Sequence, residues 1–280
     1  MELIKFENFF FRYKGNDDYA LNNINLVIKE DLSKFILLCG QTGSGKTSFI
    51  RCLNGLIPQF YAGFYKGRVE VCGKNTINTP IADLSTDVGI VFQNPENQLI
   101  SMNVEHEIAF GLENLGVSPK EISERIEENA SLTEIEHILD KAPFELSGGE
   151  QQRVAIASIL ALKPKLIILD EPTALLDPYM AKKIINLLDE IKNEKKITII
   201  ISEHRLDLIL PFADNIILMK NGFMLEYDSS EKVINGSNFQ NLELNKPVIY
   251  SIFSKLKEEK LFLKNIPRSI IKAIQELKKY

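Results

Sequence analysis

Gly40-Gln41-Thr42-Gly43-Ser44-Gly45-Lys46-Thr47 is the stretch that decides the fold. It fits the pattern G-x-x-x-x-G-K-[ST] and stands between the apolar run Phe35–Cys39 and a helix predicted to begin near Lys46. Glycines let backbone N–H groups converge on an anion without hindrance from Cβ atoms, and the helix start adds its positive dipole end. The stretch therefore predicts a phosphate-binding loop. The alternative is a chance glycine-rich turn, but such a turn would not require a buried strand before it and a helix after it.

The residue types within the loop predict separate roles. Lys46 is expected to reach the β- and γ-phosphates of a nucleotide, and Thr47 to bind Mg²⁺. We count Ser48, the next residue, among the nucleotide-binding residues. A nucleoside triphosphate and Mg²⁺ are the ligands that this pattern predicts.

A pair of carboxylates follows a second apolar run. Leu166–Leu169 is followed directly by Asp170 and Glu171, at the carboxyl end of a predicted buried strand, where open α/β sheets bind ligands. Asp170 is expected to hold Mg²⁺ and Glu171 to act as general base on the attacking water. Alone, Asp170 could equally be the N-cap of a helix; the phosphate loop favours the catalytic interpretation.

Composition excludes several classes of protein. A chain of 280 residues with a net charge of −5 gives no electrostatic reason to expect nucleic acid. The apolar runs are four or five residues long, which suits buried strands and is far short of a membrane span. The N-terminus lacks a secretory pattern, and three cysteines without metal-ligand spacing fit reduced thiols in the cytoplasm.

The order of predicted elements indicates an α/β protein with added parts. Asn221-Gly222 between two apolar runs predicts a hairpin, and Pro247 and Pro267 divide a helical tail into two short helices. Strands are predicted at 2–9, 22–28, 35–39, 67–72, 88–92, 166–170, 197–201, 216–219 and 223–227, and helices from 46, over much of 103–140, near 150–161 and at about 179–193. We therefore predict a mostly parallel sheet with two added subdomains.

Leu146-Ser147-Gly148-Gly149-Glu150-Gln151-Gln152-Arg153 resembles the signature sequence of ABC ATPases. The resemblance implies a P-loop NTPase (RecA-like) core with an antiparallel β subdomain and an α-helical subdomain. It also implies that Ser147, Gly148, Gly149 and Glu150 bind the nucleotide held by the opposite subunit of a dimer. A serine-capped helix start carries the dipole and free N–H groups that such a role needs.

Further positions follow the order of motifs in that family. Tyr13, in Phe11-Arg12-Tyr13, resembles the aromatic residue that stacks on adenine, although a lone tyrosine is more often a packing residue. Gln93 resembles the glutamine that contacts Mg²⁺ and water, and Asp177 closes a segment that crosses the dimer interface. His204 resembles the switch histidine that contacts the γ-phosphate; a lone histidine would usually be structural, but this one follows a buried strand.

A narrower resemblance is to the ATPases of energy-coupling factor (ECF) importers, which take up vitamins or Co²⁺ and Ni²⁺. The stretches that carry it are Asn54–Pro58, Phe92–Leu99 and Ala109–Asn114. It implies an ATPase domain over 1–236, with the helical subdomain at about 97–160, and a helical extension over 237–280. The implied partners are a second ATPase, identical or paralogous, a transmembrane coupling protein and a small membrane protein that captures substrate. The implied location is the cytoplasmic face of the cell membrane.

Other functions remain as alternatives. The chain could serve a conventional ABC importer or exporter, or a soluble ABC protein of DNA repair or translation. The latter carry long insertions or two cassettes, whereas only 53 positions separate Gln93 from Leu146 and one cassette is present. A non-catalytic regulatory partner is disfavoured by the intact Glu171 and His204.

The segment after Gln93 is the predicted docking surface for the membrane partner. Apolar side chains would form its floor and two acids its charged rim; the alternative is that these side chains pack the helical subdomain. The apolar residues are Leu99, Ile100, Met102, Val104, Ile108 and Phe110, and the acids are Glu105 and Glu107.

Overall fold

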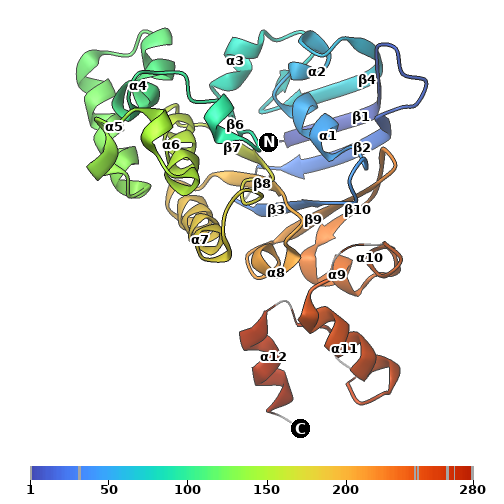
Figure 1. The fold of residues 1–280 in the computed structure, drawn as a ribbon. Helices are drawn as coiled ribbons and strands as arrows, with labels where there is room; N and C mark the ends of the chain where they lie inside the picture. Colours follow the sequence, from blue (N-terminus) through green and yellow to red (C-terminus); the bar gives the residue numbers. More distant parts are fainter. Residues whose placement is uncertain are drawn as a thin grey trace.

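The computed structural model describes residues 2–30, 33–242, 244, 246–262, 265–267 and 269–278. Two sheets, a group of helices on one side and a C-terminal helical segment make up these residues (Figure 1). The fold class predicted from the sequence is confirmed, because a mostly parallel sheet lies beside an antiparallel sheet and a helical subdomain.

The antiparallel sheet comes from the N-terminal part of the chain. Its strand order is β2-β1-β4-β5. The bounds are β1 (Glu2–Tyr13), β2 (Leu21–Lys29), β4 (Gly63–Val71) and β5 (Lys74–Asn75). In β2 alternate side chains are buried, as expected for a strand with one face on the core. The predicted strand over 2–9 extends to Tyr13, so this residue lies at the end of a strand.

The central sheet has six strands in the order β10-β9-β3-β8-β7-β6. All neighbours are parallel except β9 and β10, which form the predicted antiparallel hairpin. The bounds are β3 (Phe35–Cys39), β6 (Val88–Val91), β7 (Leu166–Asp170), β8 (Thr198–Ser202), β9 (Asn215–Lys220) and β10 (Phe223–Ser229). Strands β3, β7 and β8 are buried over their whole length, which explains their uninterrupted apolar runs. Their carboxyl ends meet at one edge.

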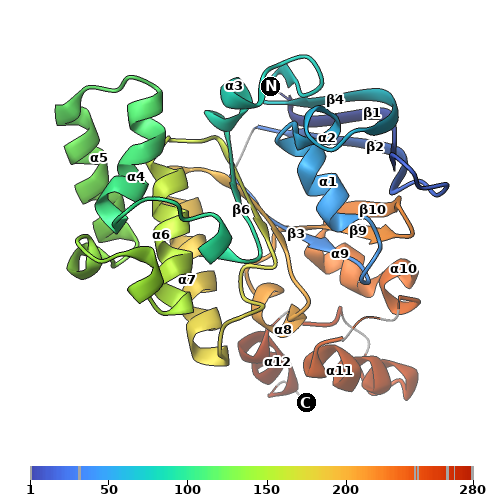
Figure 2. The same ribbon diagram turned by 45° about the horizontal axis from the view of Figure 1, so that its top comes forward.

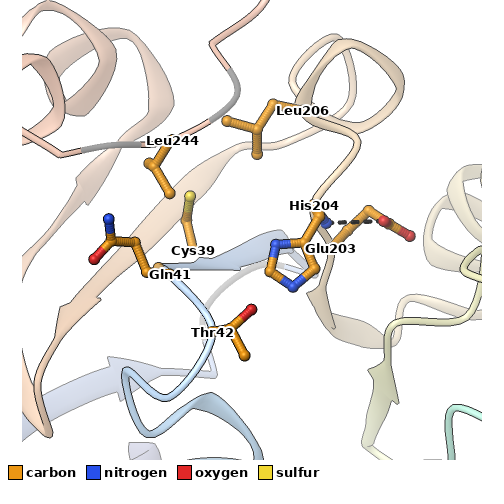
Figure 3. Close-up of a pocket in the computed structure, with 8 residues that line it drawn as sticks. Cys39, Gln41, Thr42, Glu203, His204, Leu206 and Leu244 are labelled. Carbon is orange, nitrogen blue, oxygen red and sulfur yellow. Dashed lines mark hydrogen bonds between the residues drawn. The ribbon is translucent and has the colours of Figure 1, made fainter.

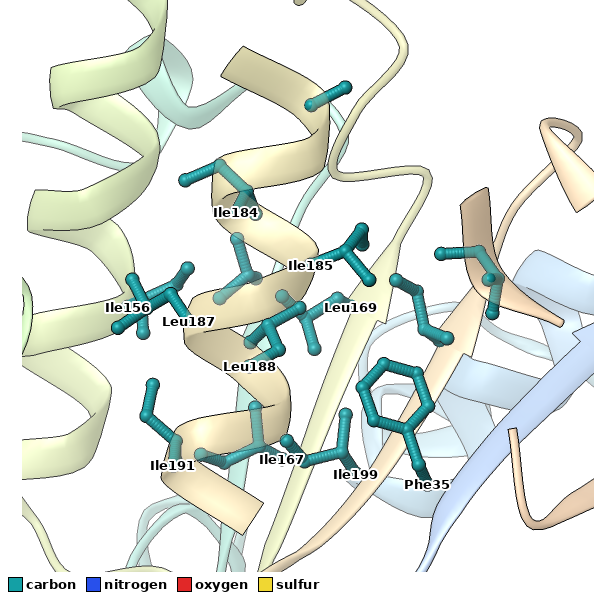
Figure 4. Close-up of a cluster of buried hydrophobic side chains, with 14 of the residues drawn as sticks. Phe35, Ile156, Ile167, Leu169, Ile184, Ile185, Leu187, Leu188, Ile191 and Ile199 are labelled. Carbon is teal, nitrogen blue, oxygen red and sulfur yellow. The ribbon is translucent and has the colours of Figure 1, made fainter. Parts of the chain in front are cut away.

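Each face of the central sheet packs into a separate core. On one face, Ile36 and Leu38 join Phe49 of α1 (Lys46–Leu53) and the side chains of the antiparallel sheet. On the other face, the side chains of α7 (Pro178–Lys195) lie against the sheet, as Figure 4 shows. The labelled residues of that cluster are Phe35, Ile156, Ile167, Leu169, Ile184, Ile185, Leu187, Leu188, Ile191 and Ile199. The phosphate loop and the carboxylates therefore lie at the carboxyl edge of a sheet that has a hydrophobic core on each face.

The helical subdomain stands to one side of the central sheet in both views (Figures 1 and 2). It consists of α4 (Val104–Asn114), α5 (Pro119–Leu132) and α6 (Gly148–Ala161), with short 3-10 turns at Pro95–Asn97, Glu136–Ile138 and Pro143–Glu145. The small helices α2 (Leu56–Gln59), α3 (Ile81–Ser85) and α8 (Leu206–Ile209) occur elsewhere. Helix α6 begins at the sequence that resembles the signature.

The C-terminal segment contains α9 (Ser230–Asn235), α10 (Ser237–Gln240), α11 (Val248–Glu258) and α12 (Ile270–Leu277). Helix α11 follows Pro247 and α12 follows Pro267, as their prolines predicted. Its buried side chains, including Phe239 and Phe253, belong to the same hydrophobic cluster as α7. The proposed boundary at 236 therefore lies between α9 and α10 and does not separate two cores.

Candidate nucleotide-binding and catalytic site

The phosphate loop joins β3 to α1 with a backbone that requires glycine. Gly45 has φ 102°, and a Cβ there would lie 2.6 Å from the carbonyl oxygen of Ala20. At Gly40 a Cβ would lie 2.5 Å from the carbonyl oxygen of Met219. Gly43 has φ 78° but faces open space, with nothing within 4 Å of a Cβ. The glycines thus allow close packing on one side and leave the other side of the loop open.

Lys46 is folded back over this loop. Its Nζ donates to the carbonyl oxygens of Gly40 (2.9 Å) and Gln41 (3.2 Å), and only 6% of the residue is exposed. Burial lowers the pKa of Lys46, while the carboxylates of Glu171 and Asp170 act in the opposite direction. Thr47 is exposed and lines a cavity together with Thr42, Gly43 and Glu171.

The loop fits a phosphate-bearing ligand. The buried hydroxyl of Ser44 has no hydrogen-bond partner within the described chain, and a buried polar group without a partner is costly. Lys46 can exchange its two carbonyl partners for phosphate oxygens, which form stronger, charge-assisted bonds. The open side at Gly43 gives such a ligand room to approach the backbone N–H groups.

The two predicted carboxylates lie where β7 ends. Asp170 is 9% exposed and accepts a hydrogen bond of 2.5 Å from the hydroxyl of Ser202 at the end of β8. Glu171 has φ 50°, an unusual value for a residue other than glycine that is often found in active sites. The backbone N–H of Glu171 lies 3.1 Å from both Oγ and the carbonyl oxygen of Ser202, which holds this conformation.

Three predicted catalytic residues meet at Glu171. Its Oε2 accepts from Nε2 of Gln93 (3.1 Å), and its Oε1 lies 2.8 Å from Nε2 of His204. Gln93 follows β6, Glu171 follows β7 and His204 follows β8, so adjacent strands deliver all three. A carboxylate has about four acceptor positions, so both oxygens can still accept from a water molecule.

His204 also borders a cavity of about 190 Å³ beside the phosphate loop. Figure 3 shows the imidazole projecting into this cavity, near the loop residues Gln41 and Thr42. The carboxylate of Glu203 points away from it and accepts from the backbone N–H of His204 (2.8 Å). Leu244 of the C-terminal segment lines the same cavity. The phosphate loop, His204 and the C-terminal segment thus line one cavity.

Tyr13 lies at the end of β1 beside the helix that follows the phosphate loop. Its hydroxyl is 3.0 Å from Oγ of Ser48 and accepts from Nη1 of Arg51 (3.2 Å). Its ring meets two aromatic neighbours edge-to-face, Phe11 at 4.8 Å and Tyr61 at 6.3 Å between centroids. The ring is partly buried, and its hydroxyl contacts α1, the helix that follows the phosphate loop.

We expect Tyr13→Ala to raise the Michaelis constant for ATP and to leave the chemical step nearly unchanged. Base–aromatic stacking is worth about 1–3 kcal/mol in nucleic-acid sites, which is roughly a 5- to 150-fold change in affinity. Steady-state kinetics and a nucleotide titration measure both quantities. An unaltered affinity for ATP would mean that Tyr13 serves packing alone.

Ser147 and its neighbours form the N-terminus of α6. The Ser147 hydroxyl accepts from the backbone N–H of Glu150 (3.4 Å), and Oε2 of Glu150 accepts from Ser147 N (2.8 Å) and Oγ (2.6 Å). These bonds from Ser147 lower the pKa of Glu150. Ser147 and Gly148 are exposed, and among the described residues no hydrogen bond joins them to the phosphate loop. Ser147, the N-cap, and Glu150 form a capping box, and the exposed start of α6 is free to face another molecule.

The segment from Glu171 to Asp177 is tied to the turn that carries His204. Asp177 caps α7 by accepting from the backbone N–H groups of Tyr179 (2.8 Å) and Met180 (3.1 Å). The hydroxyl of Thr173 donates to Glu203, and Nη2 of Arg205 donates to the Leu176 carbonyl (3.0 Å). Ser202, Glu203 and Thr173 were not predicted as site residues. Their position beside the quoted motifs was the available signal.

The structure corrects the predicted docking surface. Glu107 is 6% exposed, and its Oε2 accepts from the backbone N–H groups of Ile100 (2.9 Å) and Ser101 (2.8 Å). The prediction that Glu107 forms a charged rim is wrong, because its carboxylate accepts hydrogen bonds from backbone N–H groups of the loop before α4. Leu99, Val104 and Ile108 are also buried, as core residues. The exposed members are Ile100 (68%), Met102 (88%), Phe110 (46%) and Glu105.

Exposed apolar residues also surround a groove next to Gln93. Its lining includes Pro95, Phe144 and Leu175, and the last two are 86% and 66% exposed. Sequence reasoning missed Phe144, which stands two positions before the quoted signature, whereas Leu175 belongs to the predicted interface segment that ends at Asp177. Phe144 and Leu175 therefore give this groove exposed apolar side chains, of the kind found at interaction sites.

The chain is similar to known proteins over most of its length. Residues 21–174 match the family model described as ABC transporter. A Pyrococcus abyssi protein provisionally named ABC transporter ATP-binding protein is 41% identical over 257 residues, covering 92% of this chain and 89% of that protein. A similarly named Pyrococcus horikoshii protein is 40% identical over the same length.

Solved structures show the same architecture. CbiO1 of Clostridium perfringens, described as part of the ABC transporter complex CbiONQ, matches with a TM-score of 0.75 and 33% identity, over 90% of this chain and 99% of CbiO1. The cassette MJ0796, solved as a dimer bound to ADP and phosphate, matches with a TM-score of 0.70 and 29% identity, over 82% of this chain and 99% of MJ0796.

Proposed function

The chain belongs to the ABC transporter ATP-binding proteins and is an ATPase subunit; from this premise we propose that it powers an importer of the energy-coupling factor type. The likeness to CbiO1 supports the proposal, together with the stretches Asn54–Pro58, Phe92–Leu99 and Ala109–Asn114. The imported substrate would be a vitamin or a transition-metal ion. ABC ATPases work as dimers with membrane components, and the dimer partner here would be a copy or a paralogue.

One observation carries the catalytic part of the proposal, namely that Gln93 and His204 both hold the carboxylate of Glu171 beside the phosphate loop. Glu171 would take a proton from the attacking water as general base. His204 and Lys46 would stabilise charge on the γ-phosphate. Gln93 would orient the water and report the state of the site to the helical subdomain.

The residues present fit a bound Mg²⁺. Thr47 supplies an exposed hydroxyl, Asp170 a carboxylate and Gln93 an amide oxygen, which are the oxygen ligands that Mg²⁺ prefers. When bound, the ion would neutralise charge on the phosphates. The hydrogen bond that Ser202 donates orients the Asp170 carboxylate for binding the ion. Asp170→Asn would weaken this hydrogen bond.

The second nucleotide contact would come from another subunit. Ser147 and Gly148 are exposed at the start of α6, and free N–H groups with a positive dipole end suit a phosphate. Gly149 is buried behind them, and Cε of Met180 lies 2.5 Å from the position that a Cβ would take. The signature of one protomer and the phosphate loop of its partner would form one composite site, with Asp177 near the interface.

Membrane attachment would require a partner. Among the residues that the structure describes, none of the helices has the length and apolar character of a transmembrane span. We place the subunit at the cytoplasmic face of the cell membrane, bound to a transmembrane coupling protein that is in turn bound to a small substrate-capture protein. Purification of the tagged chain from membranes, with mass spectrometry of bound chains, tests this. Recovery of a conventional transporter with its own substrate domain would contradict the ECF proposal.

We predict that Met102→Asp reduces recovery of the membrane partner by about tenfold, because a charge replaces an apolar anchor on the docking surface. ATP binding by the isolated subunit should be unchanged. Glu105→Lys should also weaken assembly, whereas Glu107→Lys should damage the loop that precedes α4. The matched control is Val27→Asp, a 44% exposed apolar residue on the antiparallel sheet. Equal losses in Met102→Asp and Val27→Asp would place the docking surface elsewhere.

A further inference from the structure

Arg51 has no role in any of the motifs quoted above, yet it contacts the residue proposed to stack on the nucleotide base. Its Nη1 donates to the hydroxyl of Tyr13 (3.2 Å). Its guanidinium lies 4.1 Å from the centroid of the Tyr61 ring. The stacked guanidinium is already immobilised, so little freedom is lost when it holds Tyr13.

The hydroxyl of Tyr13 is held at two points of one helix. Ser48 and Arg51 are three residues apart on α1, so both face the end of β1. Because Arg51 can only donate, the Tyr13 oxygen accepts from Arg51 and its own proton can go to Oγ of Ser48. Tyr61 also meets the Tyr13 ring edge-on. Tyr13 is thus fixed in position and in orientation.

The same helix begins with the residues that are proposed to hold the phosphates. Lys46 and Thr47 come directly before Ser48 on α1, and Arg51 follows about one turn later. A helix is rigid over such a distance, so the spacing between the phosphate end and the base end of the site is fixed by α1. A ligand that bridges both ends benefits from this preorganisation, because less ordering is needed on binding.

We propose that Arg51, stacked on Tyr61, is a positioning residue that fixes Tyr13 as the platform for the nucleotide base. This inference rests on the proposed base-stacking role of Tyr13. Arg51 would then strengthen binding of the base-bearing part of the nucleotide. The phosphate-binding part of the site should not depend on it.

The test compares Arg51→Met with Tyr13→Ala and Tyr13→Phe in the full chain. Arg51→Met should raise the KM for ATP by about three- to tenfold and change kcat much less, which is the size expected for loss of one ordinary hydrogen bond. Binding of inorganic tripolyphosphate, which has no base, should be unaffected. Arg51→Lys, which keeps a donor, should restore part of the affinity for ATP. The matched control is Arg68→Met on β4, whose guanidinium pairs with Glu70.

A double-mutant cycle tests whether Arg51 acts on nucleotide affinity through Tyr13. If Arg51 acts through the Tyr13 hydroxyl, Arg51→Met should add almost nothing in a Tyr13→Phe background. Additive losses of ATP affinity in the double variant would overturn the inference. Equal losses of ATP and tripolyphosphate affinity would also overturn it, because they would mean that α1 as a whole had been disturbed. An Arg51→Met chain with unchanged KM alongside a weakened Tyr13→Ala chain would also overturn it. An unchanged Tyr13→Ala affinity would instead refute the proposed role of Tyr13 itself.

Discussion

Glu171→Gln is expected to lower the rate of ATP hydrolysis by about 10²–10⁴, the usual cost of losing general-base catalysis. The amide keeps the size of the side chain and can still accept from Gln93 or His204 through its oxygen. Nucleotide binding should therefore persist. The variant should accumulate as an ATP-bound dimer, which size-exclusion chromatography with and without ATP will detect.

The control for this variant is Glu136→Gln, which changes an exposed carboxylate of the helical subdomain in the same way. It should hydrolyse ATP at the normal rate and give no ATP-dependent dimer peak beyond that of the unaltered chain. Normal turnover in Glu171→Gln would remove Glu171 from the role of base. Loss of ATP binding would show that the substitution had disturbed the strand end, since Glu171 adopts a positive φ held by Ser202.

Local pattern was sufficient to locate the elements that carry the site. The run Phe35–Cys39 was predicted as a buried strand and is β3, because a strand covered on both faces needs apolar residues at every position. Asn221-Gly222 predicted the hairpin of β9 and β10, since Asn221 (φ 49°) and Gly222 (φ 79°) adopt the left-handed conformation that the turn requires. These features depend on neighbours in sequence, so the sequence alone contains the signal.

Features that depend on contacts between distant segments could not be predicted. Glu107 was predicted to lie on a charged rim because it belongs to the segment after Gln93, but its carboxylate reaches the backbone of Ile100 and Ser101. The bond from Arg51 to Tyr13 crosses 38 positions, and that from Thr173 to Glu203 crosses 30. The roles of Gln93 and His204 were predicted only through family resemblance, and their convergence on Glu171 was not predicted, because sequence spacing does not define side-chain direction.

Ser147→Arg is expected to abolish most hydrolysis without much loss of binding of the first nucleotide, because Ser147 would act on the ATP of the opposite subunit. Loss of one transition-state donor alone typically costs about 10²–10³ in rate. Arginine also adds bulk at the exposed start of α6. Lys46→Ala should be inactive for a different reason, since it removes the phosphate-binding ammonium within the same chain. Each variant is assayed alone and then mixed with the other.

In a homodimer, mixing the two variants should restore activity. A mixed dimer joins the intact phosphate loop of the Ser147→Arg chain to the intact signature of the Lys46→Ala chain, and the other site carries both defects. Equal mixing should recover about one quarter of the unaltered rate, since half of the dimers are mixed and each keeps one intact site. Differently tagged chains establish that mixed dimers form. If they form and no activity returns, the composite arrangement is wrong.

Recovery would also answer the objection that Ser147→Arg merely unfolds the helical subdomain. Ser147 is the N-cap of α6, and loss of an N-cap typically costs about 0.5–2 kcal/mol of stability. In the mixed dimer, however, the Ser147→Arg chain must supply a working phosphate loop, Glu171 and His204. An unfolded chain could not do so. Restored hydrolysis would therefore require that the variant folds and that its defect acts on the partner's nucleotide.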